Sequence, residues 1–391
     1  MPEDTLLAPD PRIFPDVASA PEPARAAYSL AEKALRADTT QEADAFDREL
    51  GTVLRARLEG DGEELARMLP GAPSIGVARH LWRALDVAWR GATHVAGSAL
   101  DVTVFAVPLV IVVGREGAGG SGVLPGMLAD PSRLAAILRE HGALSGNETF
   151  ALSNALVAAE TIDVARLPTI LAGCRLPDSL GAGARLSPHA LPPAPMEFRS
   201  GQESVHLRFL PGIAMAKPEA DLTSDTTTRK WGIPFTRELT VQLAPGDASV
   251  LALPRAPQRL LPAVAAGRAA QREVAAQLFA SNAIRKFRAT VGEPTAVISA
   301  HRAAGAPGGG ELRLSLSSPF EPRDAEGFRC PLYPLDRAGD VATMLVDLLR
   351  DCRVTDIRTL AGVHADLVDG TSAPLLFKPD SIPAAATFRT H

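Results

Sequence analysis

The sequence predicts an α+β fold, with a helical N-terminal layer, a mixed central region and a C-terminal antiparallel sheet that has helices on one face. Three observations lead to this class. Apolar residues recur at helical spacing through residues 24–94, residues 102–113 form an uncharged run rich in β-branched side chains, and residues 295–360 change between strand and helix patterns.

The N-terminal layer is expected to consist of helices over residues 24–37, 41–58, 61–69 and 75–90. The last of these carries a single apolar stripe, whose members are three or four positions apart: Ile75, Ala78, Trp82, Leu85 and Trp89. Such a stripe is typical of a helix that packs one side against a core. The tryptophan pair is therefore expected to serve packing.

Residues 102–113 (VTVFAVPLVIVV) carry no charge, so a membrane-spanning helix has to be considered. A spanning helix needs about 20 apolar residues, and Asp101 and Arg115 bound this run on its two sides. Pro108 and the many β-branched residues favour a buried strand, or two strands joined by a bend at Pro108.

Proline-rich segments predict the domain organisation. Residues 1–23 contain six prolines and five acidic residues against the single cation Arg12, which is typical of an extended tail. Residues 177–195 contain five prolines and are expected to be a linker. They divide residues 24–176, which hold the helices and the central strand, from an α+β domain over residues 196–391.

Three segments outside the clear patterns also receive an expectation. A helix is predicted over residues 131–141, with Asp130 as its N-cap. Residues 149–162 fit a helix or a strand equally well. Residues 218–232 (PEADLTSDTTTRKWG) are polar and are predicted to form a loop.

The C-terminal part has the clearest pattern. Strands are expected over residues 295–301, 311–317, 328–333 and 354–360, and helices over residues 261–291 and 336–352. Gly292 and Pro294 predict where the long helix ends. In the segment ELRLSLS the leucines are expected to face the core, whereas Glu311, Arg313 and Ser315 are expected to face solvent.

Gly117, Gly119 and Gly122 form a G-x-G-x-x-G pattern in the glycine-rich loop 114–126, directly after the central strand. They are the candidate cofactor-binding residues, because such loops let the backbone approach a phosphate. The sequence around this pattern does not match a nucleotide-binding loop, because Pro125 and Gly126 precede the next helix and no P-loop lysine follows. A surface or partner-contact loop is favoured over nucleotide binding, and no cofactor is predicted.

Other chemical motifs are weak. The sequence contains no G-x-S-x-G and no H-E-x-x-H, so neither a catalytic residue nor a metal site is predicted. The densest acid–histidine cluster, formed by His364, Asp366 and Asp369, is expected to be a solvated loop.

Two further features bear on partners and compartment. The basic cluster of Arg285, Lys286 and Arg288 lies at the end of a predicted helix, where cations interact favourably with the negative end of the helix dipole. The chain as a whole is acidic, with a net charge of −5. Nucleic-acid binding is therefore disfavoured. The cysteines show no C-x-x-C spacing and are expected to be reduced thiols: Cys174, Cys330 and Cys352.

These observations favour a non-enzymatic, cytoplasmic interaction or assembly protein of bacterial type, with self-association as one form of it. The acidic N-terminus lacks the basic region of a secretory signal, and the alanine- and arginine-rich usage is typical of a high-GC genome. Ile13, Phe14 and Trp231 are the predicted partner contacts, and for Trp231 a place in the core fits equally well. One alternative is an enzyme or binding protein that holds a phosphorylated small molecule at loop 114–126. A second is nucleic-acid binding.

Overall fold

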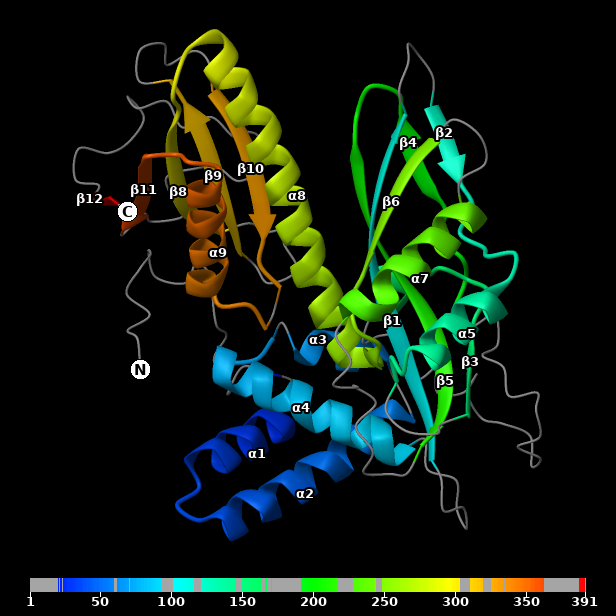
Figure 1. The fold of residues 1–391 in the computed structure, drawn as a ribbon. Helices are drawn as coiled ribbons and strands as arrows, with labels where there is room; N and C mark the ends of the chain where they lie inside the picture. The colour runs from blue at the N-terminus through cyan, green and yellow to red at the C-terminus, as the bar shows by residue number, and fades with distance from the viewer. Residues whose placement is uncertain are drawn as a thin grey trace. The chain divides into compact units, whose positions relative to one another are not determined.

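The computed structural model describes residues 20, 22, 24–59, 62–69, 71–92, 101–115, 121–144, 149–162, 166, 170, 191–216, 228–243, 248–302, 310–318, 325–333, 335–361 and 387–390 (Figure 1). Their helices and largely antiparallel sheets confirm the α+β class. The chain divides into two compact units. The N-terminal unit combines Glu22–Met68 with His80–Gln271, and the C-terminal unit combines Leu69–Arg79 with Arg272–His391.

The predicted N-terminal helices are confirmed as α1 (Ala24–Arg36), α2 (Thr40–Leu58), α3 (Gly62–Met68) and α4 (Ile75–Ala92). α1 and α2 pack against each other, and each buries one apolar stripe. The Tyr28 hydroxyl donates a hydrogen bond to the Met68 carbonyl at 2.9 Å, which ties α1 to the end of α3.

The central sheet of the N-terminal unit has the strand order β3-β5-β1-β6, and β7 also pairs with β1. Its strands are β1 (Asp101–Arg115), β3 (Thr149–Leu152), β5 (Ser204–Ala216), β6 (Ala248–Pro254) and β7 (Gln258–Arg259). A separate pair joins β2 (Ser121–Leu124) to β4 (Met196–Arg199). Residues 149–162, for which the sequence fits a helix or a strand equally well, form the strand β3 followed by the short 3₁₀ helix η2 (Ala159–Ile162).

β1 is one continuous strand that passes through Pro108, so the two-strand alternative is wrong. β6 pairs with β1 only as far as Pro254, and the Arg255 amide then donates to the Pro108 carbonyl at 2.8 Å. Pro108 therefore faces the gap between β6 and β7. Its missing N–H costs little there, because the ladder is already interrupted.

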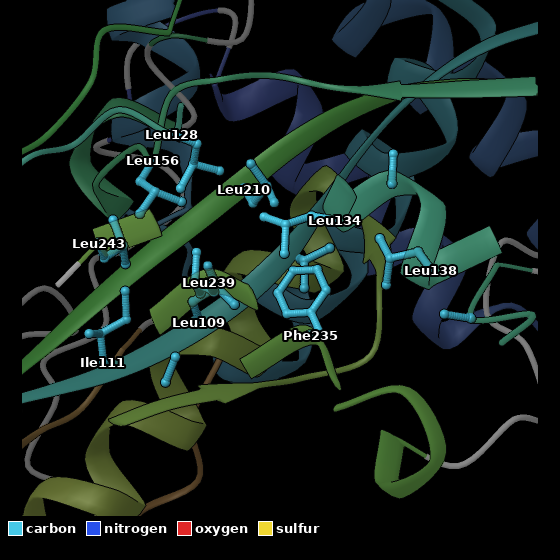
Figure 2. Close-up of a cluster of buried hydrophobic side chains, with 14 of the residues drawn as sticks. Leu109, Ile111, Leu128, Leu134, Leu138, Leu156, Leu210, Phe235, Leu239 and Leu243 are labelled. Atoms are coloured by element: carbon cyan, nitrogen blue, oxygen red, sulfur yellow. The ribbon is translucent and has the colours of Figure 1, made fainter. Parts of the chain in front are cut away.

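Two helices cover one face of this sheet, α5 (Pro131–Glu140) and α7 (Thr228–Leu243). Figure 2 shows Leu134 of α5 and Phe235 of α7 near Leu109 of β1 and Leu210 of β5, and Leu138 of α5 belongs to the same cluster. The Asp130 side chain accepts a hydrogen bond from the Ser132 amide, which confirms the predicted N-cap.

The strand pairing changes the predicted domain boundary. β1 pairs with β5 along thirteen residues, and β2 pairs with β4, so residues before and after the proline-rich segment 177–195 belong to the same unit. The chain instead passes from the N-terminal to the C-terminal unit between Met68 and Leu69, returns between Arg79 and His80, and passes over again between Gln271 and Arg272, within the helix α8 (Leu260–Thr290). The expected tail lies outside the described residues except for positions 20 and 22, and so do residues 177–190 of the expected linker.

The C-terminal unit contains a sheet in the order β10-β9-β8-β11-β12, from β10 (Ala325–Pro331), β9 (Gly310–Ser317), β8 (Thr295–Arg302), β11 (Asp356–Ala361) and β12 (Thr387–Thr390). Neighbouring strands are antiparallel except for the parallel pair β8–β11. The apolar face packs against α8 and α9 (Ala338–Asp351), as predicted. Gly292 has a φ of +120°, which confirms the predicted end of α8.

Within the described ranges, no helix is long and apolar enough to cross a membrane. The uncharged run 102–113, which raised that question in the sequence, lies in β1.

Candidate functional site

Gly122, one of the predicted cofactor-binding glycines, lies in strand β2 opposite Phe198 of β4. A Cβ atom at this position would overlap the Phe198 ring, so the absence of a side chain lets the ring cross the strand. This is a packing role. Gly117 and Gly119 lie outside the described residues, and phosphate binding by the three glycines stays a prediction.

Trp231 was expected to contact a partner, but its side chain has an exposed fraction of 0%. Its ring packs edge-to-face on Phe235, with 5.4 Å between ring centroids, inside the core of the N-terminal unit. In this conformation Trp231 therefore contacts the core and not the surface. Ile13 and Phe14 lie outside the described residues.

The structure exposes a different part of the same helix. α7 begins at Thr228, inside the segment predicted to be a loop, because Trp231, Phe235, Leu239 and Leu243 give it a buried stripe at four-residue spacing. The outward stripe, which we call the α7 stripe, consists of Lys230, Ile233, Arg237 and Val241. The Ile233 and Val241 side chains are 69% and 70% exposed.

The other sides of α7 are held in place. The Thr236 and Thr240 hydroxyls donate to carbonyls of the edge strand β6, at 2.9 Å to Ala252 and 3.5 Å to Val250. Gln242 exchanges two hydrogen bonds with the backbone of Asp130, at the start of α5. The helix thus covers a strand edge that would otherwise be open, and the α7 stripe is its remaining outward face.

The second notable feature is the face of the C-terminal sheet opposite the helices. The residues of this polar face come from alternate positions of β8, β9 and β10: Ser299, His301, Glu311, Arg313, Ser315 and Arg329. The expectation that Glu311, Arg313 and Ser315 face solvent is wrong, because only 5%, 2% and 2% of their surfaces are exposed. Alternation predicts which side of a sheet a residue takes, but not whether that side is covered.

Charged groups lie close together on the polar face. Glu311 Oε1 accepts a hydrogen bond from Arg313 Nε at 2.5 Å and lies 3.9 Å from Arg329 Nε. Arg313 and Arg329 are direct cross-strand neighbours. Burial, and then the charges of Arg313 and Arg329, lower the pKa of His301 to about 4, so this imidazole is neutral at pH 7.

A Ser–His contact on the polar face resembles the start of a nucleophilic site, since Ser299 Oγ lies 2.8 Å from His301 Nε2. The same contact recurs in β5, where Ser204 Oγ lies 3.0 Å from His206 Nε2. Residues two apart share one face of a strand, so Ser-x-His brings these groups together in any strand. We therefore assign no nucleophile to either pair.

The remaining sequence motifs add no site among the described residues. There, no group of three or more His, Cys, Asp and Glu side chains could hold a metal ion. Two members of the basic cluster are paired with acids, Lys286 with Glu326 at 2.5 Å and Arg288 with Glu293 at 2.7 Å. The His364 cluster and Cys174 lie outside the described ranges.

The other two cysteines are free thiols. Cys330 belongs to the core of the C-terminal unit, where burial raises its pKa to about 12. A thiol with so high a pKa is a poor nucleophile at neutral pH.

Comparisons with known proteins found no matching protein-family model, no matching curated protein and no matching solved structure.

Proposed function

We propose that this protein is a non-enzymatic, cytoplasmic interaction protein of bacterial type that self-associates, with the acidic tail of one copy bound to the α7 stripe of another. The α7 stripe is the observation that carries the proposal. Two aliphatic side chains about 70% exposed lie on a helix whose other sides are buried or hydrogen-bonded. Their burial by a partner would remove apolar surface from water.

The tail offers a complementary sequence. Along the α7 stripe, cations and aliphatic side chains alternate in the order Lys230, Ile233, Arg237 and Val241. In the tail, the apolar pair Ile13 and Phe14 lies between the acids Asp10 and Asp16. Opposite charges on either side of an apolar contact favour binding and fix its register. The prolines of the tail reduce the entropy that an extended segment loses when it binds.

Charge also distinguishes this arrangement from a symmetric pairing of two α7 helices. In a two-fold interface the same patch meets itself. Arg237 lies between Ile233 and Val241, so it would approach the Arg237 of the other copy, and like charges repel. An acidic occupant avoids this repulsion.

Sedimentation velocity over a range of protein concentrations tests the proposal. We expect the full chain to self-associate, and we expect both a chain without residues 1–23 and the double variant Ile233→Ser/Val241→Ser to sediment as monomers. Val87→Ser is the matched control, because Val87 is a 60% exposed valine on α4 and lies outside the proposed surface. The proposal is contradicted if the full chain is monomeric, or if the truncated chain and the double variant each still self-associate.

A further inference from the structure

The C-terminal unit contains a buried cation whose hydrogen bonds are incomplete. The Arg313 side chain is 2% exposed, and its Nε donates to Glu311. Its Nη2 is fully buried and has no hydrogen-bond partner. Buried polar atoms in proteins are nearly always paired, and an unpaired charged donor is costly. This atom therefore indicates that an acceptor binds there.

The charges around Arg313 favour an anion as that acceptor. Among the described residues, Glu311 is the acid that contacts both Arg313 and Arg329, and these three groups carry a net charge of +1. His301, on the next strand, adds no charge at neutral pH. Farther along the face, Arg358 is already paired with Asp356, through two hydrogen bonds of 2.8 Å. The described part of this cluster thus carries one excess positive charge.

The edge strand β10 carries the most exposed member of this cluster. Arg329 lies on β10 directly opposite Arg313, and its side chain is 42% exposed. Burial increases from Arg329 on β10 to Arg313 on β9 and then to Ser299 and His301 on β8, whose exposed fractions are 0% and 1%. An anion that meets Arg329 first would then reach the unpaired donor of Arg313.

We propose that the polar face is a binding site for a small oxyanion, a phosphate or carboxylate group held between Arg313 and Arg329. The planar guanidinium groups match the geometry of such oxygens and form charge-assisted hydrogen bonds with them. The bound group is a free anion from solution; a carboxylate side chain of the protein itself has the same chemistry, and the experiment separates these two sources. The site lies in the C-terminal unit and is independent of the α7 stripe.

Titration calorimetry of the full chain with inorganic phosphate, in an oxyanion-free buffer, tests this site. We expect saturable binding to one site. Arg329→Gln, at a partly exposed position where folding is retained, should weaken the affinity about tenfold, as expected for one charge-assisted hydrogen bond. Glu311→Gln keeps the acceptor for Arg313 Nε but removes the competing negative charge, so it should tighten binding severalfold.

Arg358→Gln is the matched control, because it removes an arginine from the same face whose guanidinium is already paired with Asp356. Its affinity for phosphate should equal that of the original protein. A thermal melt of each variant shows that it is folded. If the full chain shows no saturable phosphate binding, then a carboxylate of the protein or no anion at all occupies the site, and the proposal is overturned. Equal weakening by Arg329→Gln and Arg358→Gln also overturns it.

Discussion

Lowering the pH should destabilise the C-terminal unit through His301. The pKa of this imidazole is about 4 in the folded protein, because burial and the neighbouring arginines disfavour its charged form, whereas the ordinary value is 6.5. Above pH 6.5 both the folded and the unfolded chain hold it neutral. Between pH 6.5 and pH 4 the unfolded chain binds a proton that the folded chain does not, so stability falls as the pH falls.

The size of the effect follows from the interval between the two pKa values. Each pH unit is worth about 1.4 kcal/mol, so His301 should contribute a loss of about 3 kcal/mol by pH 4. Urea unfolding at several pH values between 7 and 4 measures this loss. His206, whose pKa is lowered by burial and then by Arg208, titrates in the same direction and has to be separated from His301.

The His301→Gln variant makes this separation, because glutamine does not titrate while all other groups remain. The variant should be less stable at pH 7, but its stability should fall by about 3 kcal/mol less between pH 7 and pH 4. An NMR titration of the His301 ring should give a midpoint far below 6.5. A ring that titrates near 6.5, or a variant with an unchanged pH dependence, would refute the argument that this face is buried and cationic.

Two predictions concern packing in the N-terminal unit. Gly122→Val should lower the free energy of unfolding by about 1–3 kcal/mol, because its side chain would overlap the Phe198 ring. Gly51 lies in a helix, and a Cβ atom added there would meet nothing within 4 Å beyond its chain neighbours and the backbone of its own helix, so Gly51→Ala should raise the free energy of unfolding by about 0.5–1 kcal/mol in the same denaturation assay. A loss of stability in both variants would contradict the packing role of Gly122. Trp231→Ala should cost about 3–5 kcal/mol, since the ring is fully buried, whereas Ile233→Ser should change stability by less than about 0.5 kcal/mol. Similar losses of stability from these two substitutions would show that the outward side of α7 has been assigned incorrectly.

Local patterns predicted most of the secondary structure. The apolar spacing of residues 75–90 predicted α4, and Asp130 predicted the start of α5, because the groups that cause these features lie within a few turns of one another. Long-range pairing left no such local signal. β1 pairs with β5, about 100 residues later in the chain, and so the proline-rich segment between them was mistaken for a domain boundary.

The site residues were harder to predict for a related reason. Residues 218–232 are mostly polar and were predicted to form a loop, so the start of α7 was missed, although Trp231 and Phe235 have helical spacing. The alternation in 311–317 correctly placed Glu311 and Arg313 on one side of the strand, but burial of that side depends on the tertiary structure. Gly122 matched a phosphate-binding pattern whose spacing a packed strand can also satisfy.

The binding of a labelled peptide of residues 1–23 to the chain that lacks these residues tests the central claim most directly. Fluorescence anisotropy should show saturable binding that weakens as salt is added, because charges take part in it. Arg237→Glu should weaken it at least tenfold, since it places a negative charge between Ile233 and Val241. A peptide that does not bind, or that binds the Arg237→Glu variant with equal affinity, would contradict the proposal that the tail and the α7 stripe recognise each other.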